Sequence, residues 1–256
     1  MFKNQELLSI LALAAIAVAG LGVPVAQAGD ISGVTNLLAA NHYDEADLRQ
    51  LEMFNADTGQ WMFTFDPLPG GLQASMGTKA TEFHDGYWYT FTTVDEPNRI
   101  AAVYRYDIDG TNPTLVAENV TGMIEGFAAD DNHLYVGTKG GWGWTGGLYK
   151  FDMSTTPYTP LGQINAGNFA GMDFGPDGNL YSGNEGTGKV SIHDTDGNGL
   201  GQFDLTRAYR PEFHPDGDLY VTSYSDNPVV SHFNSPLHAD PLLRAFGDRA
   251  VKPARC

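Results

Sequence analysis

Residues 194–199 have the types and the spacing to bind a calcium ion. Oxygen-bearing side chains stand at alternate positions, Asp194, Asp196 and Asn198, and a glycine follows them, which is the spacing of the first half of a calcium-binding loop. The twelfth position of such a loop holds a bidentate glutamate, whereas Leu205 stands there in this chain. A plain hairpin turn explains the same residues equally well. The sequence therefore leaves two alternatives open, a structural calcium site and an ordinary turn.

A glycine-rich segment at 139–147 carries an unusual pair of aromatic residues, Trp142 and Trp144. A loop with so few side chains cannot easily bury two indoles, and exposed tryptophan is typical of surfaces that bind sugars or other flat apolar faces. With Lys139, these residues form a candidate ligand-binding site. The alternative is a loop that folds back over the domain.

Two arginines, Arg207 and Arg210, are candidates for binding an anion, or for pairing with neighbouring acids. The seven histidines follow no metal-binding spacing, and the chain has no serine nucleophile motif and no phosphate-binding loop. No catalytic residue can be assigned, and the question of enzymatic activity stays open.

The elements that must position these residues come from an internal repeat. Three copies, at 126–138, 172–183 and 212–223, join a short apolar strand to an alternating strand through a turn rich in aspartate and glycine. The Leu-Tyr pairs of these copies are 46 and 39 residues apart. A fourth copy lies at 82–92, and a degenerate fifth at 36–42 keeps only the second half. A second hairpin follows in each unit, and four strands per repeat are typical of the blades of a β-propeller.

The sequence therefore predicts an all-β protein, a β-propeller of about five four-stranded blades. The predicted units are residues 31–70, 71–120, 121–166, 167–206 and 207–247. The first unit lacks a convincing innermost strand, and no segment after Phe246 is expected to supply it. Residues 248–256 are expected to form an irregular tail.

An export signal is predicted at residues 1–28. An apolar run from Leu7 to Val25 ends in a small-x-small pattern at Ala26 and Ala28, which is typical of a cleaved signal peptide. The run is also just long enough for an uncleaved anchor, although its ending favours cleavage. We expect a periplasmic or extracellular domain at 29–247, without a stable membrane span after cleavage.

Charge and cysteine content narrow the possible partners. The formal net charge is −17, which argues against nucleic acid because phosphate binding requires clustered Lys and Arg. The single cysteine, Cys256, allows no internal disulfide. The fold must therefore be stabilised by packing and hydrogen bonds.

Residues 175–181, and 37–42 followed by 53–59, resemble NHL-type repeats. Such repeats occur in exported propellers of the senescence-marker-protein/gluconolactonase and streptogramin-lyase-like group, and the resemblance covers roughly residues 33–235. These families usually have six blades, so a truncated six-bladed ring is the alternative to five blades. The resemblance is specific for the fold and weak for activity, because propellers host binding, hydrolysis and lysis alike.

The resemblance also implies a metal ligand. In the lactonase group a Glu-Gly step at the start of a blade supplies a carboxylate to a divalent metal, and Glu125 precedes Gly126 at that place. Asn184 and Glu185, after another second strand, could add oxygen ligands for Ca²⁺, the candidate cofactor. Further oxygen donors at this mouth are Asp95, Asn98 and Asp226. The alternative is that each of these residues is an ordinary solvated loop side chain of a very acidic protein and binds no metal.

We expect an exported propeller that binds a small molecule, a carbohydrate or a protein at the channel mouth, without an identifiable catalytic set. The alternative is a calcium-dependent hydrolase, lactonase-like, or a lyase at the same mouth. The hypotheses differ in whether Glu125, Asn184 and an acidic residue of a third blade converge on one point.

Overall fold

The computed structural model describes residues 37–43, 49–55, 57–65, 80–95, 98, 100–141, 145–184, 186–214, 217–223, 229–233 and 250–251. All regular structure in these ranges is β, and the strands form one three-stranded sheet and four four-stranded sheets, with antiparallel neighbours throughout. None of the described segments is a helix long and apolar enough to cross a membrane.

The three-stranded sheet consists of β1 (Leu37–Tyr43), β2 (Arg49–Asn55) and β3 (Trp61–Thr64). The next sheet contains β4 (Glu82–His84), β5 (Tyr87–Asp95), β6 (Ile100–Asp107) and β7 (Thr114–Thr121). It is followed by β8 (Met123–Ala129), β9 (His133–Lys139), β10 (Gly147–Asp152) and β11 (Thr159–Ala166). The remaining two contain β12 (Met172–Phe174), β13 (Leu180–Asn184), β14 (Lys189–His193) and β15 (Gly199–Asp204), then β16 (Ala208–Phe213), β17 (Leu219–Ser223), β18 (Val230–Phe233) and β19 (Ala250–Val251).

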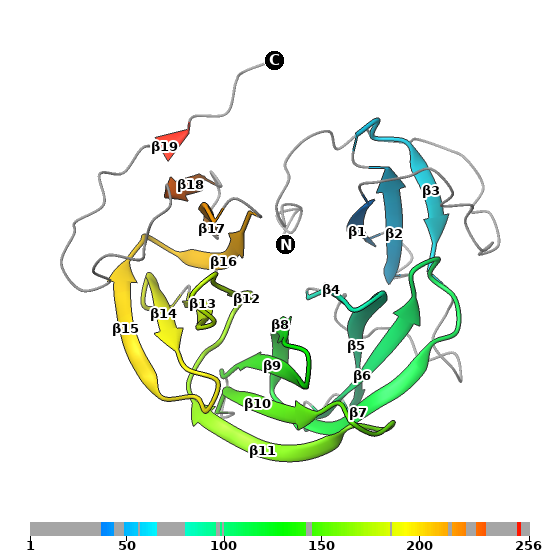
Figure 1. Cartoon of the computed structure of the whole chain (residues 1–256), viewed down its shortest axis with the longest axis horizontal. Coiled ribbons are helices and arrows are strands. Elements are labelled where there is room, and N and C mark those ends of the chain that lie inside the picture. The colour runs from blue at the N-terminus through cyan, green and yellow to red at the C-terminus, as the bar shows by residue number, and fades with distance from the viewer. Residues whose placement is uncertain are drawn as a thin grey trace, which may run out of the picture.

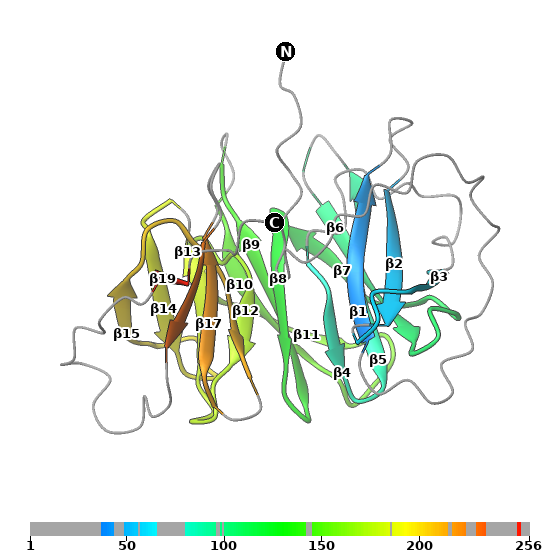
Figure 2. The same ribbon diagram turned by 90° about the horizontal axis from the view of Figure 1, so that it is seen from above.

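The sheets are arranged as propeller blades around a common axis, and the region along this axis is called the channel below (Figure 1). Strands β4, β8, β12 and β16 lie nearest the centre, while β7, β11 and β15 lie outermost. Strand β12 lies beside both β8 and β16, and β4 lies beside β8. In the side view, strands such as β4, β8 and β17 run along the shortest axis of the molecule, from one face of the propeller to the other (Figure 2). The prediction of an all-β propeller is confirmed, with four blades of four strands each.

The repeat of the sequence aligns the three-stranded sheet with the second, third and fourth strands of a blade. In the turn from β2 to β3, the carbonyl of Asn55 accepts the N–H of Gly59 at 2.8 Å. A tighter contact, over three residues instead of four, closes the turns after β6 and β14, from Gly110 to the Asp107 carbonyl at 2.9 Å and from Gly197 to the Asp194 carbonyl at 3.0 Å. In the described part of the chain this sheet contains three strands, and residues 31–36 of the predicted first unit lie outside the described residues.

The last blade obtains its fourth strand from the expected irregular tail. Val251 and Ala250 of β19 pair with Val230 and Ser231 of β18. The expectation of a wholly irregular tail is therefore wrong for these two residues. A strand of two residues is too short to show the alternation by which strands are recognised in a sequence.

The hydrophobic core lies between neighbouring blades. Leu134, Tyr135 and Val136 of β9 are each 0% exposed, whereas the side chains of the outermost strand β11 are mostly exposed. Burying one large apolar side chain stabilises a fold by about 1.5–3 kcal/mol. The packing of blade on blade therefore holds the innermost strands around the channel.

Candidate functional site

The innermost strands bring three acidic residues to one level of the channel. Each acidic residue lies opposite a tyrosine near the start of the second strand of its blade. In the β8–β11 blade an alanine takes the place of the acid. The pairs are Glu82 with Tyr89, Ala128 with Tyr135, Asp173 with Tyr181, and Glu212 with Tyr220. Residues at one register of equivalent strands point in equivalent directions. The carboxyl groups of three blades therefore form one cluster.

Arg210 crosses the channel between these acids. Its Nε lies 3.0 Å from Glu212 Oε2, and its Nη2 lies 3.8 Å from Glu82 Oε2. Nη2 also donates to the carbonyl of Thr81 at 3.2 Å, so the side chain reaches from β16 to the β4–β7 blade. Gly171 makes room for this path, because a Cβ there would lie 2.4 Å from Arg210 Cγ.

The environment of the cluster favours protonated carboxyls. Burial raises the pKa of Glu82 well above its ordinary value, although Arg210 opposes the shift. Burial and then the charge of Glu212 raise the pKa of Asp173 to about 7. The N–H groups of Phe213 and Phe174, which donate to Asp173 at 2.6 and 2.8 Å, limit that rise. A carboxyl whose pKa lies near neutral pH can hold or release a proton under working conditions.

Burial alone would lower the pKa of the Arg210 guanidinium, but the surrounding carboxyls outweigh burial and raise it. Arg210 is therefore a permanent positive charge at this level of the channel. The contacts of Arg210 agree with the alternative that it pairs with neighbouring acids, and Arg207 is exposed on the turn before β16.

A second contact lies nearer the loop end of the channel, between Glu125 and Tyr209. Glu125 is 4% exposed, and Tyr209 Oη donates to its Oε2 at 2.5 Å. Each residue stands at a register irregularity of its innermost strand, between Ile124 and Gly126 in β8 and between Ala208 and Arg210 in β16. A β-bulge redirects side chains, which allows Tyr209 and Arg210 both to reach across the channel although they are consecutive.

Of the other predicted metal ligands at this mouth, the structure describes the side chains of Asn184 and Asn98. The Oδ1 of Asn184 accepts the N–H of Thr187 at 3.2 Å and so caps its own turn, and Asn98 is exposed. Outside the described residues lie Glu185, Asp226 and the side chain of Asp95.

The chemistry of the channel also tests whether a divalent metal fits. In the described part of the chain, no group of three or more His, Cys, Asp or Glu side chains could hold a metal ion. The guanidinium of Arg210 lies among the channel carboxyls and would repel a cation placed beside them. The carboxyls beside Arg210 therefore do not fit Ca²⁺.

The acidic segment at 194–198 forms a capped turn. Asp194 Oδ1 accepts the N–H groups of Asp196 at 3.0 Å and Asn198 at 2.8 Å, and Oδ2 accepts the Asn198 side-chain amide at 2.8 Å. The bonds from Asn198 are the main cause that lowers the pKa of Asp194. These contacts are those of the plain-turn alternative, because the oxygens of Asp194 are directed to the turn itself.

The proposed tryptophan site is described only at its edges. Lys139 ends β9 and is half-buried, and the N–H of Gly140 donates to Asn168 Oδ1 at 2.7 Å. Trp142 and Trp144 lie outside the described residues.

Sequence reasoning missed Tyr209 and the acids that surround Arg210. A signal for the acids exists, because an acidic residue precedes phenylalanine at the end of three innermost strands, in Glu82, Asp173 and Glu212. No comparable pattern marks Tyr209, whose role depends on a bulge and on a partner from another blade.

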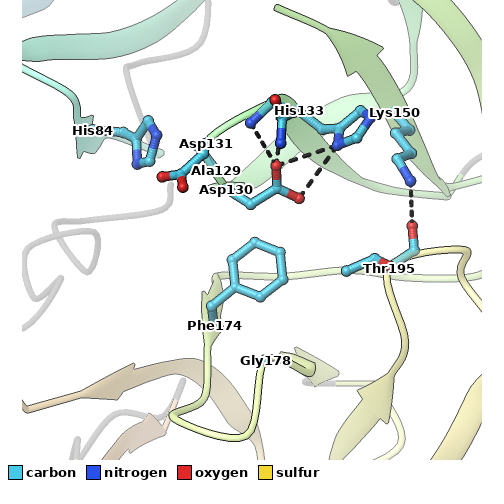
Figure 3. Close-up of a pocket in the computed structure, with 10 residues that line it drawn as sticks. His84, Ala129, Asp130, Asp131, His133, Lys150, Phe174, Gly178 and Thr195 are labelled. Atoms are coloured by element: carbon cyan, nitrogen blue, oxygen red, sulfur yellow. Dashed lines mark hydrogen bonds and ion pairs between the residues drawn. The ribbon is translucent and has the colours of Figure 1, made fainter.

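A pocket of about 470 Å³ lies at the opposite, turn end of the channel (Figure 3). The last residues of three innermost strands contribute to it, His84, Ala129 and Phe174. The turns of two blades and two strands, β9 and β10, supply the rest of its wall, which comprises Asp130, Asp131, Asn132, His133, Lys150, Gly178 and Thr195.

Several solved propellers are similar to this chain in structure. Regucalcin, a calcium-binding protein from Agrobacterium tumefaciens, gives a TM-score of 0.51 at 16% identity over 77% of this chain and 68% of its own. A gluconolactonase from Xanthomonas campestris gives 0.50 at 19% identity over 72% and 68%. A chain of the nidogen/laminin complex gives 0.53 at 15% identity over 77% and 71%.

No protein-family model and no curated protein sequence matches this chain. At these identities the structural similarity shows the fold, and propellers of one fold include enzymes and binding modules. In its fold, the chain is a β-propeller similar to the gluconolactonase and regucalcin propellers, the group that its sequence resembles.

Proposed function

We propose that this chain is an exported propeller that binds a small polar ligand at the loop end of its channel, without a divalent metal. The observation that carries the proposal is the place of Arg210, whose guanidinium lies 3.0 Å from Glu212 and 3.8 Å from Glu82. A fixed guanidinium supplies positive charge and directed N–H donors among acids. In this reading it takes the electrostatic role that a bound cation would have.

The mouth above Arg210 supplies the polar groups for such a ligand. Glu125 and Tyr209 come from β8 and β16 and meet at 2.5 Å, so they bring a carboxylate and a phenol together there. Ligand sites commonly combine a concave mouth with a few converging polar groups. We propose this pair as the polar anchor of the ligand.

A lactonase-like hydrolase is the second candidate. The raised pKa of Asp173, about 7, suits a residue that transfers protons at neutral pH. The fold similarity to a gluconolactonase supports the same class. In that case Asp173 would act as the general acid or base, with Arg210 as the charge that stabilises an anionic intermediate.

Metal analysis of the purified protein, thermal melts with calcium or chelator, and an assay with glucono-δ-lactone separate these candidates. We expect no stoichiometric metal, no shift of Tm with calcium, and no lactone hydrolysis. Hydrolysis that is lost in Asp173→Asn but independent of chelator would establish the second candidate. Bound calcium that disappears in Glu125→Gln would overturn the metal-free proposal.

We also propose that the three-stranded sheet is an incomplete fifth blade, and that residues 1–28 are removed on export to the periplasm or medium. The sequence repeat, which aligns β1 and β2 with the second and third strands of the other units, supports the blade assignment. Mass spectrometry of the protein recovered outside the cytoplasm of an expressing bacterium tests the cleavage, which is expected before Gly29. A full-length chain retained in the membrane fraction would contradict it.

A further inference from the structure

The pocket at the turn end is separate from the Glu125 site. Strand β8 carries Glu125 near its start and ends at Ala129, beside the pocket wall. A strand rises about 3.3 Å per residue, so Glu125 and Asp130 are roughly 16 Å apart along it. The pocket volume of about 470 Å³ falls in the range of small-molecule sites, about 300–1,000 Å³. The size is therefore suitable for a ligand of its own.

One wall of this pocket is held rigid by Asp130. Its Oδ1 accepts the N–H groups of Asn132 and His133, both at 2.8 Å, and its Oδ2 accepts the Tyr135 hydroxyl at 3.0 Å. Partial burial acts to raise the pKa of Asp130, but these hydrogen bonds outweigh burial and lower it. Asp130 therefore stays ionised and fixes the β8–β9 turn, which presents Asp131 and Asn132 at the surface.

The same blade carries a buried donor, Lys150 of β10, which is the cross-strand neighbour of Tyr135. Its side chain is 11% exposed, and Nζ donates to the carbonyl of Thr195 at 2.8 Å and lies 3.6 Å from Asp196 Oδ1. Figure 3 shows this amine and the Thr195 carbonyl together at the pocket wall. An ammonium has three N–H donors, and these two acceptors account for two of them. The ammonium also lies over the Tyr135 ring, 5.5 Å from its centroid, so an acceptor in the pocket would share or replace one of these contacts.

The charge of the lining decides between classes of ligand. Two carboxylates, Asp130 and Asp131, outweigh the one lysine, and the whole chain carries −17, so anions are disfavoured. The described residues include no group of three acids and histidines that could hold a metal ion, and Lys150 repels small cations. An uncharged ligand with both donors and acceptors agrees best with this lining.

Phe174 gives the pocket an apolar face. Its ring meets Tyr135 edge-on, with centroids 5.3 Å apart, and it stands between Asp130 and Gly178 in Figure 3. A Cβ on Gly178 would contact nothing within 4 Å, so this side is open. Sugars combine an apolar C–H face with hydroxyl groups, and the C–H face packs on aromatic rings.

We propose that this pocket binds a neutral saccharide, with its C–H face on Phe174. Its hydroxyl groups donate to Asp131 and accept from Lys150. Asn132 adds an amide that can serve either as donor or as acceptor.

Saturation-transfer NMR and calorimetry on the purified mature protein test this site. The probes are methyl α-D-glucopyranoside and maltose as neutral sugars, D-glucuronate as an anion and D-glucosamine as a cation. We expect the neutral sugars to bind more tightly than both charged ones. Asp131→Ala and Phe174→Leu are each expected to weaken binding about tenfold, through loss of a charge-assisted hydrogen bond and of ring contact.

Asp57→Ala is the matched control, because Asp57 is also an exposed aspartate in a hairpin turn, in the three-stranded sheet, and it should leave binding unchanged. Thermal melts show whether Phe174→Leu still folds. If it does not, the test rests on Asp131→Ala alone, because Asp131 is exposed. The proposal is overturned if no neutral sugar shows saturation transfer, or if glucuronate binds more tightly. It is equally overturned if sugar binding survives Asp131→Ala and is lost in Glu125→Gln, since the sugar would then lie at the loop end.

Discussion

Tyr209 donates a hydrogen bond of 2.5 Å to Glu125 across the channel, and each residue stands at a bulge in an innermost strand. The bond joins the first strand of the last blade to the first strand of a blade two units earlier. Since Glu125 is 4% exposed, its carboxylate depends on protein groups rather than on water for hydrogen bonds. The contact therefore connects the loop end of the channel to the stability of the fold.

Tyr209→Phe removes this hydrogen bond and leaves the buried carboxylate with one donor fewer. We expect a loss of about 1–3 kcal/mol in the free energy of unfolding, measured by urea denaturation. Glu125→Gln keeps an acceptor for the tyrosine and should cost less. A double-mutant cycle with no coupling energy between the two positions would show that the bond contributes nothing.

Gly171→Ala places a methyl group on the path of Arg210. The new Cβ would lie 2.4 Å from Arg210 Cγ and 2.9 Å from its Cα, so the backbone or the arginine must move. We expect destabilisation of roughly 1–3 kcal/mol, seen as a lower midpoint in urea. Gly199→Ala is the control, because a Cβ there meets nothing within 4 Å. Equal effects of the two substitutions would contradict the close approach.

Arg210→Met removes the positive charge and keeps most of the side-chain volume. The carboxyls of Glu82, Asp173 and Glu212 would then lie together without a counter-charge. We expect the free energy of unfolding to fall by roughly 2 kcal/mol at neutral pH, a value reduced from that of a fully buried ion pair because the site is partly exposed. At acidic pH, where the carboxyls are protonated, the loss should be smaller. A loss that does not depend on pH would point to packing instead of charge.

Asp173 makes stability depend on pH in a defined direction. Its pKa is raised from 3.8 to about 7, so the folded state binds the proton more tightly than the unfolded chain. The stability that this group contributes is complete below its unfolded pKa and is lost as the pH rises through about 7.

Asp173→Asn cannot titrate, so the wild type should lose stability relative to this variant between about pH 4 and about pH 7. For one proton, the difference in the free energy of unfolding between the wild type and this variant can change by at most about 1.4 kcal/mol per pH unit. Urea midpoints across this range measure it, and Asp204→Asn, whose side chain is 90% exposed, is the control. Parallel curves for wild type and Asp173→Asn would show that the pKa of Asp173 is not raised.

The sequence was sufficient for the fold because each repeat carries its own local pattern. The turn of residues 175–178 is closed by its own backbone, with Gly178 N–H on the Gly175 carbonyl at 2.9 Å, and such local contacts are visible as Pro-Asp-Gly in a sequence. Strand β19 was missed because its two residues pair with β18 across a long segment. Pairing at that range leaves no local signal.

The candidate site was predictable only one residue at a time. Glu125 and Arg210 were singled out, but their partners Tyr209 and Glu82 were not, since each pair joins separate blades. At Asp194 the two alternatives could not be separated from the sequence for a related reason: acidic spacing shows which oxygens are available, whereas their hydrogen bonds to the turn appear only in three dimensions.

The charges around Arg210 are distributed over three blades, with Glu82 on β4, Asp173 on β12, and Glu212 and the arginine itself on β16. Repeat proteins change readily by duplication or loss of a unit, because each unit packs mainly on its neighbours. Here such a change would alter the ratio of acids to guanidinium at the centre of the ring. The cluster thus couples the copy number of the repeat to the charge balance of the channel.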